Sequence, residues 1–308
     1  MSDLKLFQTK DGGLTELDSS SAPLERALQT LFENNLETLL GVRFLASEYA
    51  TTHGGRMDTL GVDENGYPVI IEYKRDRSEN VINQGLFYLD WLMDHRGDFE
   101  IQVRDRYGKE AADEIEWSAP RLICIAADFK KYDEHAVKQM SRNIELVRYK
   151  KFGEDLLLLE LLTSVSTAAA PASTGDQVSG GAKGRKYKTN SESLADAGEE
   201  LSNLYADVED YMLGMGDDVT KKTLKNYFAF RRIKNFACVE VRPSLGVVRV
   251  YLKINPDTVA LVDGLKEGFA RDVRNVGHFG TGDLEVNLKS HDDLERAKLW
   301  IVQSYEAS

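Results

Sequence analysis

Three ionisable residues lie in two strand-like runs that flank a predicted tight turn. The turn is Asp63-Glu64-Asn65-Gly66, in which Asn-Gly tolerates the positive φ that hairpin turns require. A hairpin closed here brings Asp58 and Glu72, 14 positions apart in the sequence, close together in space. Lys74 follows Glu72 by two residues, so strand alternation directs both side chains to the same face. The sequence therefore predicts two carboxylates and one amine at a single place.

Two carboxylates and a lysine on one face of an apolar hairpin are costly to bury unless they are paired or bound to a cation. Oxygen ligands of this kind suit Mg²⁺, which keeps several waters and binds through one or two carboxylates plus a substrate phosphate. A lysine beside such an ion can orient the attacking water or neutralise charge that develops on phosphorus. The spacing is equally compatible with a surface ion pair on an edge hairpin.

The composition is that of an ordinary globular protein. The chain has 308 residues, enough for two domains, with 42% hydrophobic and 29% charged residues. No apolar run reaches the length of a membrane span, and the N-terminus lacks the layout of a secretory signal. Cys124 and Cys238 are expected to be reduced core residues, because they form neither a disulfide framework nor a zinc spacing. We therefore expect a cytoplasmic protein with no membrane partner.

The formal net charge of −12 argues against a nucleic-acid function, because phosphate neutralisation usually requires a basic patch. Local basic clusters are nevertheless present. They are the segments 74–77, 130–131, 148–151 and 221–222 with 231–232. An acidic overall surface with a metal site favours selective over indiscriminate DNA binding.

The elements around the hairpin predict an α/β fold with a mixed central sheet flanked by helices. Helices are expected over 23–40 (with Ser20-Ser21 as its cap), 81–92 (capped by Ser78), 99–115 and 132–142, and strands over 42–49, 120–127, 144–149 and 156–162. The run at 120–127 is continuously apolar, which is typical of a strand buried on both faces. Gln84 and Tyr88 are four apart on their helix and therefore neighbours on its surface.

A change in composition divides the chain. Residues 1–162 form the first predicted domain, and the Ser-, Ala- and Gly-rich stretch 163–193 reads as a flexible linker. Residues 194–308 are expected to form a second, smaller α+β domain. Its predicted elements are helices over 194–212 and 290–305, an apolar-basic segment at 220–233, a hairpin of 238–242 with 247–254, and a strand at 284–288.

Several motifs accompany the Asp…Glu-x-Lys triplet. They are Gly55-Arg56-Met57-Asp58-Thr59-Leu60, the Asn-Gly hairpin, Val69-Ile70-Ile71-Glu72-Tyr73-Lys74-Arg75 and Gln84-Gly85-Leu86-Phe87-Tyr88-Leu89. Together they resemble the core of the PD-(D/E)XK nuclease superfamily, above all its RecB/NucS-like members with a Gln-x-x-x-Tyr signature. The resemblance is good over roughly residues 22–95. It departs at Met57, where the pattern that names the family has proline. The resemblance implies a restriction-endonuclease-like core.

The resemblance also implies a function. It is that of a divalent-metal-dependent endodeoxyribonuclease, acting in DNA repair or in defence against foreign DNA, with Mg²⁺ or Mn²⁺ as the cofactor and DNA as the partner. The alternative is a non-catalytic nucleic-acid-binding or assembly protein on a nuclease fold, because some members keep only the fold.

The resemblance implies roles for individual residues. Asp58 and Glu72 would ligate the metal, with the backbone carbonyl of Tyr73 as a third ligand, and Lys74 would position the water. The site would be completed by Glu25, favoured over Glu33 because of its Leu-Glu-x-x-Leu context, and by Gln84. Substrate contacts are expected from Arg56, Arg75 and Tyr88.

The second half resembles an uncharacterised domain that follows such nuclease domains in proteins often labelled "predicted transport protein". The matching stretch runs from Phe269 to Val273 and from Gly277 to Val286. Its Arg271, Arg274 and His278 are consistent with a loop that contacts phosphate or DNA, and equally with turn chemistry. We interpret this half as a targeting or dimerisation module, which allows a homodimer formed through it.

Overall fold

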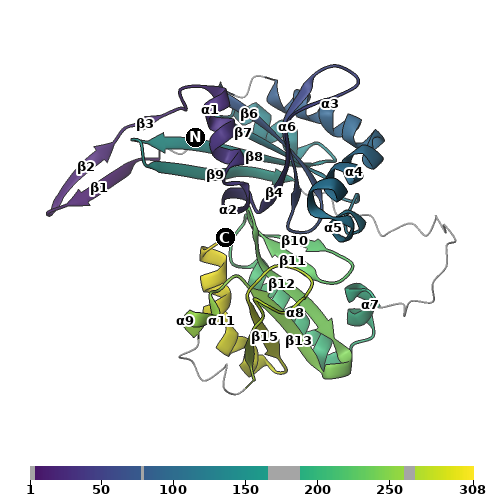
Figure 1. Ribbon diagram of the computed structural model, residues 1–308. Helices are drawn as coiled ribbons and strands as arrows, with labels where there is room; N and C mark the ends of the chain where they lie inside the picture. Colours follow the sequence, from purple (N-terminus) through teal and green to yellow (C-terminus); the bar gives the residue numbers. More distant parts are fainter. Residues whose placement is uncertain (1–3, 78–79, 166–187, 260–267) are drawn as a thin grey trace. The chain divides into compact units, whose positions relative to one another are not determined.

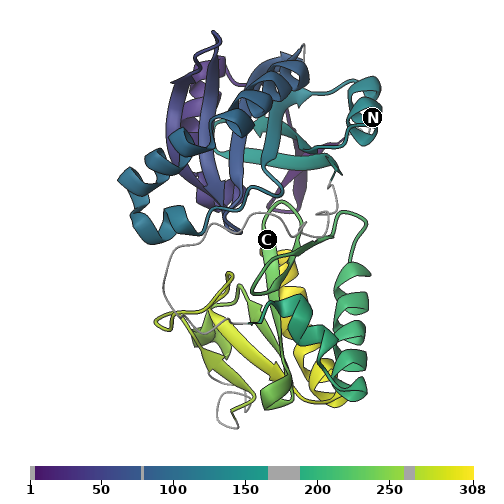
Figure 2. The same ribbon diagram turned by 90° about the vertical axis from the view of Figure 1, so that its right-hand side faces the viewer.

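Each half of the chain is built around one large β-sheet (Figures 1 and 2). The computed structural model describes residues 4–77, 80–165, 188–259 and 268–308. The chain divides into two compact units, Met1–Thr167 and Ala168–Ser308. The first holds a seven-stranded mixed sheet with helices and the second a six-stranded antiparallel sheet with helices, so the expected fold class is confirmed.

The large sheet of the first unit has the strand order β3-β8-β7-β6-β5-β4, with β9 paired to β8. Its strands are β3 (Ser19–Ser20), β4 (Val42–Ala50), β5 (Arg56–Asp63), β6 (Pro68–Arg77), β7 (Arg121–Asp128), β8 (Asn143–Phe152) and β9 (Leu156–Val165). β7 is parallel to both β6 and β8, whereas the other pairings are antiparallel. The apolar run predicted at 120–127 becomes β7 because it is covered on both faces.

Helices lie on both faces of this sheet (Figure 1). On one face, Ile70 and Cys124 belong to a core formed with the helix α3 (Val81–Asp94). On the other, Tyr73 packs edge-on against Phe32 of the helix α1 (Glu25–Glu33), with ring centroids 5.6 Å apart. Consecutive residues of β6 therefore face different layers, which places Glu72 on the α3 side.

The prediction of a single helix over residues 23–40 is wrong. Two helices form instead, α1 and α2 (Leu36–Leu40), and they are separated at Asn34-Asn35. The Asn35 side chain donates to the Leu31 carbonyl at 2.8 Å, and such local bonds compete with the helical ladder. The predicted serine cap is wrong too, because the helix is preceded by Leu24 and Ser20 lies in β3.

Other boundaries in the first unit also shift. α3 begins after Asn80, whose φ is 61°, while Ser78, the expected cap, lies outside the described residues. The helix expected over 99–115 is divided by Gly108 into α4 (Arg96–Tyr107) and α5 (Lys109–Asp113), because Gly108 has a φ of 92°. α6 (Lys131–Lys138) matches the short helix expected before β8. The N-terminus forms a hairpin, β1 (Leu6–Lys10) with β2 (Gly13–Leu17).

The sheet of the second unit is antiparallel throughout, in the order β10-β11-β12-β13-β15-β14. Its elements are α7 (Asn190–Ala195), α8 (Glu199–Leu213), β10 (Thr220–Thr223), β11 (Phe228–Arg231), β12 (Asn235–Arg242), η1 (Pro243–Leu245), β13 (Val247–Leu252), α9 (Pro256–Val259), β14 (Ala270–Asp272), β15 (Leu284–Leu288) and α11 (His291–Glu306). One face of the sheet packs with α8 and α11 around an apolar core. The apolar-basic segment 220–233 thus becomes two paired strands.

The ends of the expected linker 163–193 hold regular structure. β9 extends to Val165, and α7 begins after Thr189, whose side chain accepts a hydrogen bond from the Glu192 amide. Residues 166–187 lie outside the described part. Among the helices of the described ranges, none is long and apolar enough to cross a membrane.

Candidate functional site

The hairpin between β5 and β6 closes at the predicted residues. Gly66 adopts a φ of 83°, and the Asp63 amide donates to the Tyr67 carbonyl at 2.9 Å. The Asp63 carboxylate accepts from the amides of Asn65 and Tyr67 and from the buried guanidinium of Arg121, each at 2.9 Å. Arg121 also forms a two-bond contact with Glu145. This ion cluster anchors the turn to β7 and β8 and is structural.

Asp58 and Glu72 are interlocked across the two strands. The Asp58 amide donates to Glu72 Oε1 at 3.2 Å, and the Tyr73 amide donates to Asp58 Oδ2 at 3.0 Å. Glu72 is completely buried, and its Oε2 accepts no hydrogen bond from any residue that the structure describes. The register beside them, Thr59 with Ile71, brings these two side chains together as the hairpin predicts.

Glu25 and Lys74 meet at the same place. Lys74 Nζ donates to Glu25 Oε1 at 3.2 Å, and the Arg75 amide donates to Glu25 Oε2 at 3.1 Å. Glu33, at the other end of α1 from Glu25, instead accepts a hydrogen bond from the Thr59 hydroxyl at 2.7 Å. The structure therefore brings Glu25, rather than Glu33, to Lys74.

The carboxylates disturb one another's ionisation. Burial raises the pKa of Glu72 to about 9, and the negative charge of Asp58 adds to the effect. Burial also raises the pKa of Asp58, although the Tyr73 amide and the Lys74 ammonium oppose the rise. A cation bound beside these two carboxylates would stabilise their ionised forms. The pair therefore favours cation binding.

These residues fit a hard divalent ion. The electron-pair donors are carboxylate oxygens, and one of them, Glu72 Oε2, accepts no hydrogen bond within the described residues. Mg²⁺ needs only one or two protein carboxylates. Within the described ranges, no three His, Cys, Asp or Glu side chains gather closely enough to hold a metal by themselves. Asp58 and Glu72 are therefore the pair that would hold the ion, and ligation by the Tyr73 carbonyl stays a prediction.

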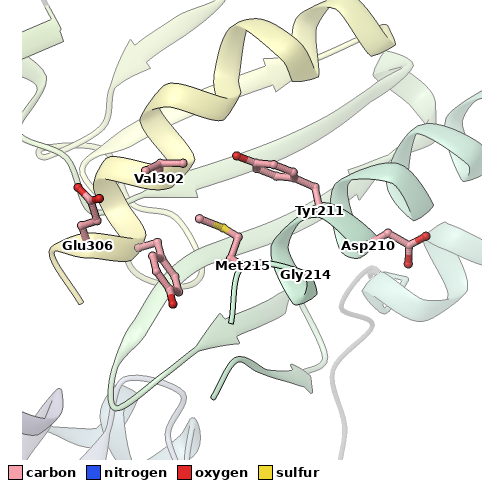
Figure 3. Close-up of a pocket in the computed structure, with 7 residues that line it drawn as sticks. Asp210, Tyr211, Gly214, Met215, Val302 and Glu306 are labelled. Carbon is pink, nitrogen blue, oxygen red and sulfur yellow. The ribbon is translucent and has the colours of Figure 1, made fainter. Parts of the chain in front are cut away.

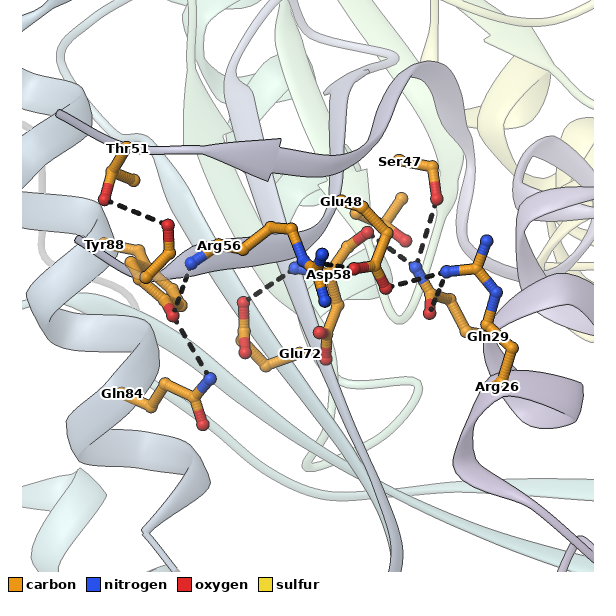
Figure 4. Close-up of polar contacts among 12 residues, drawn as sticks. Arg26, Gln29, Ser47, Glu48, Thr51, Arg56, Asp58, Glu72, Gln84 and Tyr88 are labelled. Carbon is orange, nitrogen blue, oxygen red and sulfur yellow. Dashed lines mark hydrogen bonds and ion pairs between the residues drawn. The ribbon is translucent and has the colours of Figure 1, made fainter.

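Gln84 and Tyr88 lie at the other end of the site (Figure 4). The Tyr88 hydroxyl accepts from the Arg56 amide at 3.0 Å and from Gln84 Nε2 at 3.3 Å. A Cβ on Gly55 would come within 2.9 Å of that hydroxyl, so the glycine permits this close approach. Tyr88 is buried. Its hydroxyl holds the start of β5 through the amide of Arg56, two residues before Asp58.

The sequence reading missed a network around Glu48 (Figure 4). Glu48 lies in β4 with a φ of 55°, and its carboxylate binds Arg26 at 2.7 Å and also Arg56. Its charge adds to the rise in the pKa of Asp58. Gln29 donates to the Asp58 carbonyl at 2.7 Å and to the Ser47 hydroxyl at 3.2 Å.

A signal for this network was present in the sequence. Arg26 and Gln29 follow Glu25 by one and four positions on the same helix, and Ser47-Glu48 is a polar pair inside an apolar strand. Arg26 and Arg56 keep 62% and 63% of their side-chain surface exposed, so both guanidiniums reach solvent beside Asp58.

The three residues of the second unit that were expected to contact phosphate have different partners. Arg274 binds the carboxylates of both Asp257 and Asp272 with its guanidinium. His278 stacks on Tyr251, and Arg271 lies 3.7 Å from Glu285. These hydrogen bonds organise a turn, and phosphate contact by Arg274 stays a prediction.

A separate hollow of about 530 Å³ lies between α8 and α11 (Figure 3). It is lined by Asp210, Tyr211, Gly214, Met215, Val302, Tyr305 and Glu306. None of the predicted site residues lines it.

Comparisons with known proteins match the two halves differently. Residues 191–308 match the family described as "Domain of unknown function (DUF5655)". An uncharacterised protein of Haemophilus influenzae is 29% identical over 297 residues, which cover 95% of this chain and 96% of the relative.

Some solved structures have a partial likeness to this chain. The structure of an EndoMS-dsDNA2 complex is 22% identical with a TM-score of 0.27, and covers 40% of this chain and 43% of its own. A repair endonuclease from Pyrococcus abyssi is 18% identical with a TM-score of 0.28, covering 42% and 49%. The matched part thus spans less than half of either solved chain.

Proposed function

We propose that the first unit is a divalent-metal-dependent nuclease that hydrolyses DNA phosphodiester bonds. The observation that carries the proposal is the meeting of Asp58 and Glu72 beside the Lys74–Glu25 pair, with one Glu72 oxygen that has no hydrogen-bond donor in the described part of the chain. The sequence motifs around these residues, which resemble PD-(D/E)XK nucleases, support DNA as the substrate. DNA repair or defence against foreign DNA is the proposed setting.

Each residue has a role in that chemistry. Asp58 and Glu72 would hold Mg²⁺ or Mn²⁺, which when bound supplies Lewis-acid activation and charge stabilisation. Lys74, only 24% exposed and oriented by Glu25, presents its ammonium where negative charge develops on the phosphate oxygens. Arg26 and Arg56 offer exposed guanidiniums to the neighbouring backbone phosphates.

Gln84 and Tyr88 act through the main chain. By fixing the Arg56 amide they hold β5, and thus the Asp58 carboxylate, opposite Glu72. Homodimer formation through the second unit stays a prediction, which light scattering of the purified chain tests.

The experiment is a cleavage assay with plasmid, single-stranded, branched and mismatched DNA in Mg²⁺ or Mn²⁺. We expect wild type to cleave at least one of these substrates, and Asp58→Ala and Lys74→Ala to lose about 100-fold or more in rate. Asp105→Ala, an exposed carboxylate on α4, is the matched control and should cleave like wild type.

Two results would change the proposal. Absence of metal-dependent cleavage on every substrate, combined with retained DNA binding, would favour the non-catalytic binding protein. Equal cleavage by wild type and Asp58→Ala would show that the catalytic site lies elsewhere.

A further inference from the structure

The strand β4 has an irregular backbone directly opposite Asp58. Ser47 pairs with Thr59 in the antiparallel register of β4 and β5, which places Glu48 opposite Asp58. The φ of Glu48 is 55°, whereas strand residues have φ values between about −60° and −160°. A residue in this conformation turns its peptide groups out of the strand direction, so the main chain at Asp58 depends on other partners.

Two side chains supply those partners. The Asp58 amide donates to Glu72 Oε1 at 3.2 Å, and Gln29 Nε2 donates to the Asp58 carbonyl at 2.7 Å (Figure 4). Gln29 lies on α1 and is only 4% exposed, so this hydrogen bond is shielded from water. Both peptide groups of Asp58 are therefore held by side chains from other elements.

The Gln29 carboxamide is itself fixed in orientation. Its Nε2 also donates to Glu33 Oε1 at 2.9 Å, and its Oε1 accepts from Arg26 at 3.4 Å. A carboxylate beside the nitrogen and a guanidinium beside the oxygen determine which way the amide points. Glu33 in turn accepts from the Thr59 hydroxyl at 2.7 Å, so the same network joins α1 to β5 at two neighbouring residues.

The helix α1 also carries Glu25. Glu25 precedes Gln29 by four positions, about one helical turn, and accepts from Lys74 Nζ at 3.2 Å. A shift of α1 along β5 would move the Glu25 carboxylate away from Lys74 and the Gln29 amide away from Asp58 together. One hydrogen-bonded side chain thus couples the two elements that carry Glu25 and Asp58.

We propose that Gln29 is a positioning residue of the candidate site, which sets the main chain of Asp58 and aligns α1 with β5. Its effect on catalysis rests on the nuclease function proposed above, whereas its effect on the geometry of Asp58 does not. Asp58 Oδ2 accepts from the Tyr73 amide at 3.0 Å, so a displaced Asp58 would release that amide. The exposure of the Tyr73 amide to exchange therefore reports the position of Asp58.

The first test is amide hydrogen exchange of the full-length chain, followed by NMR in EDTA. Gln29→Met keeps an unbranched side chain and removes its hydrogen bonds. We expect exchange at the Tyr73 amide to accelerate about ten-fold relative to the Ile125 amide. Ile125 is the completely buried neighbour of Tyr73 in β7, and its exchange reports opening of the sheet.

A stability control separates positioning from general destabilisation. Val137→Ala removes methyl groups from a completely buried position on α6, so it should lower the melting temperature. Because Val137 does not contact Asp58 or Gln29 through any hydrogen bond, both reporter amides should accelerate by the same factor in this variant. Gln102→Met on the exposed surface of α4 should exchange like wild type.

The second test measures Mn²⁺ affinity by calorimetry without DNA, and then cleavage of the substrate that wild type accepts. We expect Gln29→Met to bind Mn²⁺ about five-fold more weakly and to lose about ten-fold in kcat. The KM for DNA should stay constant, because Gln29 is buried away from substrate. Gln29→Glu should lose at least as much, since a carboxylate cannot donate to the Asp58 carbonyl, while Val137→Ala should keep the wild-type affinity and KM.

Two exchange results would overturn the positioning role. They are an unchanged rate at the Tyr73 amide in Gln29→Met, and equal acceleration at Tyr73 and Ile125, which would show a general loss of stability. Equal losses of Mn²⁺ affinity in Gln29→Met and Val137→Ala would contradict it as well. A wild type that neither binds Mn²⁺ nor cleaves DNA would refute the nuclease function, and the exchange comparison would still decide whether Gln29 positions Asp58.

Discussion

Asp58 and Glu72 hold each other in place through main-chain amides. The Asp58 amide binds the Glu72 carboxylate at 3.2 Å, and the amide after Glu72 binds the Asp58 carboxylate at 3.0 Å. Each acidic side chain is therefore oriented by the strand that carries the other. A cation placed between them would meet carboxylates that are already positioned, and this lowers the entropic cost of binding.

The first prediction concerns stability and pH. The folded-state pKa of Glu72 is raised from 4.5 to about 9, so between these values the folded protein binds a proton that the unfolded chain releases. Stability from this group is complete below about pH 4.5 and is lost as pH rises toward 9. Glu72→Gln, which stays neutral, should exceed wild type by about 1–3 kcal/mol at pH 8, measured by urea unfolding in EDTA.

The advantage of Glu72→Gln should disappear at pH 4.5, where wild-type Glu72 is neutral in the folded state. An advantage that is the same at both pH values would contradict a buried, proton-binding Glu72. Glu110→Gln on the exposed face of α5 provides the control and should change nothing at either pH.

A divalent ion should stabilise the folded chain without any substrate. Binding to Asp58 and Glu72 in the native state alone raises stability by about 2.7 kcal/mol at a concentration 100 times the dissociation constant. Millimolar Mg²⁺ or Mn²⁺ should therefore raise the melting temperature of wild type but not of Asp58→Asn. A rise of the same size in both proteins would place the ion elsewhere.

Glu48 should restrain the two exposed arginines. Glu48→Gln removes the charge that binds Arg26 and Arg56, so both guanidiniums become free for phosphate. In EDTA, we expect DNA affinity to rise about three-fold and the dependence of log K on log[salt] to steepen by up to about 1–2 units. Fluorescence anisotropy over a salt series measures both, and an unchanged slope would refute the restraint.

Tyr88 should act through the Arg56 amide. Tyr88→Phe leaves that amide without its acceptor, which should cost about 1–2 kcal/mol of stability. Because β5 carries Asp58, the cleavage rate should also fall while KM for DNA stays constant. The same substitution at the exposed Tyr132 is the control. A change confined to KM would instead indicate that the Tyr88 hydroxyl contacts DNA.

Arg121 should be indispensable to the first unit. Arg121→Ala removes the guanidinium that pairs with the buried Asp63 and Glu145 carboxylates, which should cost about 3–5 kcal/mol. Arg104→Ala at an exposed position should cost less than about 0.5 kcal/mol. Chemical denaturation of both variants provides the comparison, and similar small losses would mean that the buried cluster is not stabilising.

What the sequence determined by itself is the local geometry of the hairpin. The Asn-Gly turn and the alternation of β5 and β6 involve residues a few positions apart, so their pairing follows from turn chemistry and the two-residue period. The same holds for β7, whose apolar run required cover on both faces, and for α11, which Ser290 caps. Asp58, Glu72 and Lys74 were therefore recognisable as a group before any packing was known.

Only the tertiary structure decided which residues surround that group. Glu25 reaches Lys74 across 49 positions, and the contacts of Glu48 with Arg26 and of Arg121 with Asp63 span 22 and 58. The stacking of His278 on Tyr251 likewise depends on neighbours distant in the sequence. Periodicity and turn chemistry describe one segment at a time. The free-energy cost of burying a charged side chain, in contrast, is offset by the side chains that the fold places next to it.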